Sequence, residues 1–145
     1  MLVSLLATLP LMLPDNPRAM ARLESELIIW LTTVRPNGQP QASAVWFLLE
    51  DDDFLIYSKP GVAKLSNVEA NPRVALNLDG NGVGGDVVTI EGRARIVPGH
   101  TPAHEVPAFV AKYAERIERN GWTPASFAAD YSVPIRITPT RSRAW

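Results

Sequence analysis

The most regular alternation of apolar and polar residues lies between residues 87 and 97. Its apolar positions are Val88, Ile90, Gly92, Ala94 and Ile96. The intervening positions are polar or charged, which predicts a strand with one buried and one solvated face. Two of the buried positions are small, Gly92 and Ala94, and small residues there indicate a curved sheet or an element that packs close above it.

Further strands are predicted by runs of β-branched and aromatic residues. These strands cover residues 27–34, 42–49, 54–57 and 73–78, and a last one contains Ile135 and Ile137. Pro36, Asn37 and Gly38 separate the first two runs and favour a tight reversal, so residues 27–49 are expected to form a β-hairpin.

Helices are predicted at residues 18–26, 61–71, 103–119 and 123–131. Asn16 or Asp15 is expected to cap the first helix, with Pro17 at its first position. The longest helix has one apolar stripe, formed by Val106, Phe109, Val110, Tyr113 and Ile117. Its polar side chains Lys112, Glu115, Arg116 and Glu118 are expected to face away from the core.

Strands in hairpin succession with helices between some of them indicate an α+β fold, with a mainly antiparallel sheet curled into a barrel. The 145 residues suffice for one domain. We expect an N-terminal arm at residues 1–17 and the barrel domain at residues 18–145. Pro10 and Pro14 interrupt the apolar start and no Lys or Arg precedes it, so we expect this arm to pack on its own domain or on a partner subunit, with no export or membrane span.

Composition and charge exclude several classes of function. The net charge is −1, so no overall field attracts a polyanion, and we expect no nucleic-acid partner. The chain has no cysteine, which excludes disulfides, thiolate metal sites and a cysteine nucleophile. This usage is compatible with a reducing cytoplasm, the location we expect.

No pattern of residues points to acid–base, nucleophilic or metal chemistry. His100 and His104 flank Pro102 and are interpreted as surface residues, with no metal site. The carboxylates of residues 50–53 read as a solvated turn, and the glycine-rich residues 80–85 as a hairpin loop without the strand–GxGxxG–helix order of a phosphate cradle. We therefore predict no catalytic side chain, and a cofactor would have to carry any chemistry.

One segment has the features of an anion site. Tyr57, Ser58 and Lys59 end a predicted strand, and Lys64 falls in the first turn of the next helix. Helix N-termini attract anions through free N–H groups and the helix dipole. A hydroxyl and two ammonium groups nearby suit a phosphate, although lysines in loops are commonly just solvated.

The segment from Trp30 to Phe47 resembles the opening hairpin of the pyridoxamine-phosphate-oxidase-like split-barrel proteins, and in particular their deazaflavin- or flavin-dependent oxidoreductases of actinobacterial type. The similarity continues in order through Tyr57-Ser58, Lys64, Asn67, residues 71–74, the strand at residues 87–95 and residues 135–145. It implies a six-stranded split β-barrel, and a homodimer with two cofactor sites at its interface.

The resemblance also implies roles for individual residues. Lys64 matches the phosphate lysine, with Tyr57, Ser58 and Lys59 beside it. Ser43, Ala44, Val45 and Trp46 match the segment that lines the cofactor ring, although Trp46 is equally compatible with core or dimer packing. Asp86 and Val87 match further ring or phosphate contacts, and Arg143 or Trp145 of one subunit could complete the site of the other.

Two arginines of the true pyridoxamine-phosphate oxidases are absent. Ala63 precedes the phosphate lysine, and Ala42 or Ser43 holds the second arginine position. These departures argue against vitamin B6 oxidation and favour F420 over FMN. The implied activity is hydride transfer between a reduced ring and an unsaturated small molecule; the alternatives are a non-catalytic carrier or sensor of flavin, F420 or haem, and a structural dimer.

Overall fold

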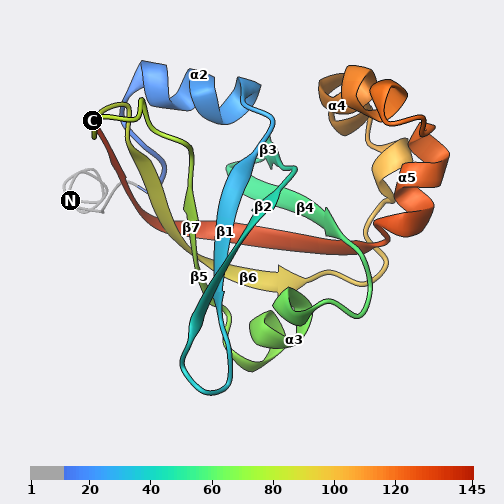
Figure 1. Ribbon diagram of the computed structural model, residues 1–145, viewed down its shortest axis with the longest axis horizontal. Coiled ribbons are helices and arrows are strands. Elements are labelled where there is room, and N and C mark those ends of the chain that lie inside the picture. Colours follow the sequence, from blue (N-terminus) through green and yellow to red (C-terminus); the bar gives the residue numbers. More distant parts are fainter. Residues whose placement is uncertain (1–11) are drawn as a thin grey trace, which may run out of the picture.

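A curled, antiparallel sheet of seven strands forms the body of the protein (Figure 1). The structure is a computed structural model that describes residues 12–145, and the predicted packing of residues 1–11 lies outside this part. The spatial order of the strands is β2-β1-β5-β6-β7-β4-β3, and all adjacent pairs are antiparallel. The predicted α+β barrel class is therefore confirmed.

The strands are β1 (Ile29–Val34), β2 (Pro40–Val45), β3 (Leu48–Glu50), β4 (Asp53–Ser58), β5 (Arg73–Asn77), β6 (Val88–Ile96) and β7 (Val133–Ala144). The helices are α2 (Pro17–Ser25), α3 (Ala63–Ala70), α4 (Pro107–Arg119) and α5 (Pro124–Asp130), with a 3-10 turn η1 (Ala103–Glu105) before α4. No helix within residues 12–145 has the length and apolarity needed to cross a bilayer.

The sheet has seven strands because the predicted strand at residues 42–49 divides in two. At the break, the backbone N–H of Phe47 donates to the hydroxyl of Tyr113 at 2.7 Å. The chain then continues as β3, which pairs with β4 at the other end of the sheet. The two edge strands β2 and β3 are thus joined directly through Trp46 and Phe47, and the open side of the barrel lies there.

The helix boundaries follow local capping rules. The side chain of Asn16 caps α2 by accepting from the backbone N–H of Ala19 at 3.1 Å, with Pro17 at the first position as predicted. The predicted helix at residues 103–119 is divided instead, because Pro107 lacks an N–H and begins a new helix. Thr123 and Ser126 form a capping box at the start of α5.

Strand β4 is buried on both faces, and each face contributes to a different core. Phe54 and Ile56 point into the barrel, where they pack with residues such as Leu31 and Ile135. The opposite face contributes Leu55 and Tyr57 to a second core beneath α4 and α5. This second core attaches the α4–α5 unit beside the barrel (Figure 1).

The alternation predicted for residues 87–97 is observed in β6, where buried and exposed positions alternate. A β-bulge between β6 and β7 falls at Glu91 and Gly92. A Cβ atom at Gly92 would lie 2.8 Å from Cγ2 of Ile137 and 2.9 Å from the carbonyl oxygen of Thr138. Glycine at this position therefore allows β7 to approach closely, as the small residues indicated.

Candidate functional site

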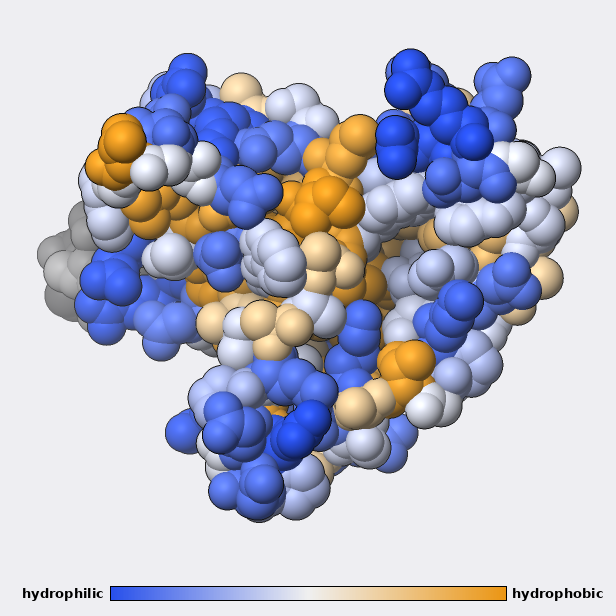
Figure 2. All heavy atoms as spheres, in the orientation of Figure 1, coloured by the Kyte–Doolittle hydropathy of each residue, from blue (hydrophilic) through white to orange (hydrophobic). Residues whose placement is uncertain are grey.

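A cleft of about 480 Å³ lies between the open side of the barrel and the α4–α5 unit. Figure 2 shows this side of the molecule hollowed between the two parts, with hydrophobic surface along the barrel. The described lining residues are Ile28, Ala44, Val45, Trp46, Tyr57, Ser58, Lys59, Val62, Lys64, Arg116, Asn120, Trp122, Phe127 and Tyr131. Its volume falls in the usual range for small-molecule sites, about 300–1,000 Å³.

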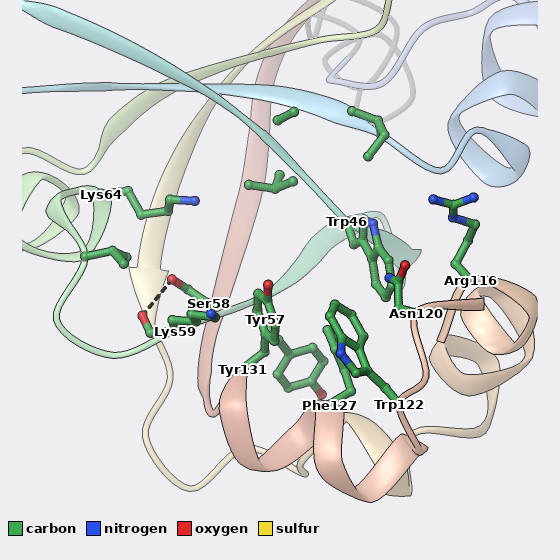
Figure 3. A pocket seen from close by; sticks show the side chains of 14 residues that line it. Trp46, Tyr57, Ser58, Lys59, Lys64, Arg116, Asn120, Trp122, Phe127 and Tyr131 are labelled. Atoms are coloured by element: carbon green, nitrogen blue, oxygen red, sulfur yellow. Dashed lines mark hydrogen bonds between the residues drawn. The ribbon is translucent and has the colours of Figure 1, made fainter. Parts of the chain in front are cut away.

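One end of the cleft, which we call the cationic end, is formed by Ser58, Lys59 and Lys64. The chain leaves β4, turns at Gly61 with a φ of 76°, and enters α3 with Lys64 as its second residue. No side chain within residues 12–145 caps the start of α3, and the N–H of Leu65 donates to the carbonyl of Val62, which leaves the N–H groups of Ala63 and Lys64 for a ligand. The side chain of Lys64 extends toward the centre of the cleft (Figure 3).

Lys64 is half-buried, and this burial lowers the pKa of its ammonium group. No carboxylate within residues 12–145 forms an ion pair with it. A partly desolvated cation without a counter-ion gains stability when an anion binds beside it. Lys64 is thus suited to binding a phosphate.

Ser58 and Tyr57 contribute to the cleft mainly through shape. Ser58 is buried, and its hydroxyl donates to the carbonyl of Lys59 at 2.9 Å. The hydroxyl of Tyr57 donates to the carbonyl of Thr101 at 2.7 Å, and burial raises its pKa to about 12. Tyr57 therefore stays protonated at neutral pH and presents its ring to the cleft.

The other end, which we call the aromatic end, is a group of stacked rings around Trp46. Trp46 stacks on Tyr113 with ring centroids 4.5 Å apart and an interplanar angle of 4°. The ring centroid of Phe127 lies 5.1 Å from that of Trp46 and 4.6 Å from that of Tyr131. The ring centroid of Trp122 lies 6.0 Å from that of Phe127. Figure 3 shows Trp46, Trp122, Phe127 and Tyr131 gathered opposite Lys64. Such a surface suits a planar ring.

The position of Trp46 depends on polar groups of α4 that lie beneath it. Tyr113 is fully buried, and its hydroxyl accepts from the N–H of Phe47 and lies 2.9 Å from the carbonyl oxygen of Leu27. The ammonium group of Lys112 donates to the carbonyl of Phe47 at 2.9 Å, and burial lowers its pKa to about 8. These contacts fix the chain at the β2–β3 break.

The expectation that Lys112 faces away from the core is therefore wrong. Its ammonium group lies 3.8 Å from the ring centroid of Phe47, and its side chain is half-buried. Helical periodicity treats a helix as covered on one side only, whereas α4 also contacts the β2–β3 break. Arg116, expected on the same outward side, is exposed but lines the cleft.

Seven of the ten predicted site residues line this one cleft: Lys64, Tyr57, Ser58, Lys59, Ala44, Val45 and Trp46. Ser43 lines a neighbouring cavity of about 200 Å³ that it shares with Lys64 and Ala63. Ser43 lies further along β2 from the break at Trp46 than Ala44 and Val45 do.

Asp86 and Val87 do not line the cleft of their own chain. The carboxylate of Asp86 forms an ion pair with Arg18 at 2.9 Å, which holds the pKa of that carboxyl below its usual value. The backbone of Val87 pairs with Trp145 at the end of the chain. The pair of Arg18 and Asp86 connects α2 to the loop before β6.

Seven lining residues were missed by the sequence reasoning, namely Ile28, Val62, Arg116, Asn120, Trp122, Phe127 and Tyr131. A signal was present in part, because Phe127 and Tyr131 are four residues apart on one helix and Trp122 directly precedes the cap of that helix. Nothing in the sequence indicates that this helix faces the end of β2.

The cleft is cationic although the chain as a whole is not. Lys59, Lys64 and Arg116 line it, and none of its described lining residues is acidic. Two cations are placed apart, with Lys64 and Arg116 on opposite sides of the aromatic residues (Figure 3). The arrangement suits a planar ligand that carries negative charge.

Comparison with known proteins identifies relatives of this fold. A family model described as pyridoxamine 5'-phosphate oxidase matches residues 16–145. No curated protein matches the sequence significantly.

Several solved structures superpose on the chain. One is described as an F420 reductase, with 27% sequence identity and a TM-score of 0.65, and the match covers 90% of this chain and 98% of that one. A conserved hypothetical protein from Mycobacterium tuberculosis has 23% identity and a TM-score of 0.71, covering 95% and 89% of the two chains. The haem storage protein HutZ from Vibrio cholerae has 18% identity and a TM-score of 0.63, covering 89% and 93%.

Proposed function

The chain belongs to the pyridoxamine 5'-phosphate oxidase family, and we propose that it is an oxidoreductase that binds F420, or else FMN, in the cleft between the barrel and α4–α5. The observation that carries this proposal is the position of Lys64. It is a half-buried ammonium group without a carboxylate partner in the described chain, at the uncapped start of α3, and it points into a cleft whose opposite end is aromatic.

The residues present fit both parts of such a cofactor. The ammonium group of Lys64 and the backbone N–H groups of Ala63 and Lys64 would hold the phosphate, with Lys59 as a second cation nearby. Ala44 and Val45 would leave room for the ring, and Trp46 would shield it from water. Bound in its reduced form, the ring would supply a hydride to an unsaturated substrate and be oxidised, and solvent would supply the proton that completes the reduction.

The preference for F420 over FMN rests on the same residues. Ala63 and Ser43 share a cavity with Lys64. The resemblance implies that the true pyridoxamine-phosphate oxidases have arginine at these positions. Lys64 therefore lacks guanidinium support that would strengthen the binding of an FMN phosphate. The F420 reductase is the relative described above that has more than 25% sequence identity.

A homodimer is part of the proposal, and the outer face of β1, β2 and β5 supports it. Cross-strand pairs place Trp30 beside Ala44 and Thr32 beside both Ala42 and Ala75. These side chains are small or apolar and at least partly exposed, which is typical of a face that a second subunit covers. Ala44 also lines the cleft, so a second subunit on this face would border the site.

Asp86 and Val87 keep a role in this proposal as contacts to the cofactor in the partner's cleft.

Sedimentation equilibrium tests the dimer: a Thr32→Arg substitution, which places a charge on the face, should shift a dimer to a monomer. A Glu118→Arg substitution on the exposed side of α4, outside this sheet, is the matched control and should leave the mass unchanged.

Separate titrations of the purified protein with F420, FMN and haem test the cofactor proposal. We expect F420 to bind more tightly than FMN, each with a dissociation constant below about 100 μM. Binding of neither ring would overturn the proposal. Tight binding of a ring without oxidation of the reduced cofactor by a panel of quinones and enones would instead favour a carrier, and haem binding alone would favour a haem protein.

A further inference from the structure

The α4–α5 side of the cleft contains a cation that cofactor binding at Lys64 does not use. Arg116 lies in the last turn of α4 and lines the cleft beside Asn120 and Trp122. Arg116 forms no ion pair within residues 12–145. Arg119, in the same turn of the helix, forms an ion pair with Glu115 at 2.8 Å. The guanidinium group of Arg116 is therefore free to bind a ligand.

The rings next to Arg116 are held rigidly. Trp46 is fixed between Tyr113 and Phe127, at centroid distances of 4.5 and 5.1 Å. The ring of Trp122 is tilted against that of Trp46, with ring centroids 6.1 Å apart, and forms the outer edge of the group. A planar molecule that stacks here loses little free energy to protein rearrangement, because the rings are already in place.

We propose that Arg116, Asn120 and the rings of Trp46 and Trp122 form the substrate site, and that it selects a planar conjugated molecule carrying a carboxylate or a similar anionic group. A guanidinium group binds a carboxylate through two parallel hydrogen bonds, and the Asn120 amide donates to or accepts from a second polar substituent. The absence of acidic residues among the described lining residues favours the same charge.

This inference rests on the proposed function, because the substrate must lie against the ring that Lys64 anchors. Lys64 and Arg116 lie on opposite sides of the cleft (Figure 3). A phosphate at the first and a carboxylate at the second are thus separated, so that cofactor and substrate avoid like-charge repulsion.

Two probes of the same shape test the charge selection. The anion 4-nitrobenzoate and its neutral counterpart 4-nitrobenzamide are titrated by calorimetry, first into the protein alone and then into protein saturated with F420. We expect the anion to bind about tenfold more tightly. Arg116→Gln should abolish this preference, and the matched control Arg119→Gln, on the outer side of the same helix, should retain it.

The outcomes separate this inference from the proposed function. If F420 binds but the wild-type protein does not distinguish the two probes, the substrate site is wrong and the cofactor site stands. An equal loss of preference in Arg119→Gln, or a loss of F420 affinity in Arg116→Gln, also overturns it, since Arg116 would then act through the general field or belong to the cofactor site. If neither F420 nor FMN binds, the proposed function fails. A tighter binding of 4-nitrobenzoate to the protein alone, lost in Arg116→Gln, would then still show that Arg116 binds the anionic group.

Discussion

The two ends of the cleft are built in different ways. The cationic end comes from one continuous segment, in which Ser58 ends β4, Lys59 follows it and Lys64 is the second residue of α3. The aromatic end combines Trp46 from the β2–β3 break with Trp122, Phe127 of α5 and Tyr131, the residue directly after α5. The first end is local in sequence and half-exposed, whereas the second is an extension of a buried core.

Because of this difference, a substitution at the cationic end can change ligand affinity without changing the stability of the fold. A substitution at the aromatic end is expected to change both. Lys64 is half-buried at the cleft and its ammonium group forms no ion pair within residues 12–145, so its replacement should change ligand affinity with little change in stability. Phe127 is 3% exposed and belongs to the core beneath α4 and α5, so its replacement should affect both. Substitutions can test this contrast.

The largest effect is expected at Phe127. Phe127→Ala removes a buried ring that contacts Trp46 and Tyr131 and should lower the free energy of unfolding by about 3–5 kcal/mol. Chemical denaturation measures it. Trp122→Ala is the control from the same end of the cleft, because its 37% exposure predicts a clearly smaller loss; equal losses would contradict the proposed continuity between the cleft and the core.

The next effect concerns affinity at the cationic end. Lys64→Ala removes a charged hydrogen bond to the phosphate and should weaken F420 binding by about 1.5–3 kcal/mol, while thermal unfolding stays unchanged. Fluorescence titration and a melting curve on the same sample measure both. Lys59→Ala should weaken binding less, because Lys59 is exposed; unchanged affinity in Lys64→Ala would place the phosphate elsewhere.

The support beneath Trp46 gives a third test. Tyr113→Phe keeps the ring stacked on Trp46 but leaves the backbone N–H of Phe47 without its partner, which should cost about 1–3 kcal/mol of stability. Tyr131→Phe is the control, since the hydroxyl of Tyr131 makes no hydrogen bond within residues 12–145, and its cost should stay within about 0.5 kcal/mol. A similar stability for both variants would show that the Tyr113 hydroxyl is dispensable.

The smallest effect is a pH dependence at Lys112. Its pKa is lowered by burial from 10.5 to about 8, so between these values the unfolded chain binds more protons than the folded one. The penalty for the buried charge is present below pH 8 and disappears as the pH rises toward 10.5. The melting temperature of the wild type should therefore rise relative to that of Lys112→Met over this interval, and a constant difference would argue that Lys112 titrates normally.

Local rules were sufficient for most of the elements. Alternation located β6 with its buried face, and Asn16 with Pro17 located the start of α2. The same rules could not find the break at Trp46 and Phe47, because residues 42–49 read as one strand. The partner that interrupts it, Tyr113, is 66 residues away in the chain.

The sequence by itself determined the order of features at the cationic end, because a strand end, a turn and a helix start follow one another at Ser58, Gly61 and Lys64 and are marked by local residue types. The tertiary structure alone decided the aromatic end and the position of Arg116. Packing of α4 and α5 against β4 brings residues from three distant segments together, and the direction of that packing depends on contacts between segments that no local pattern records.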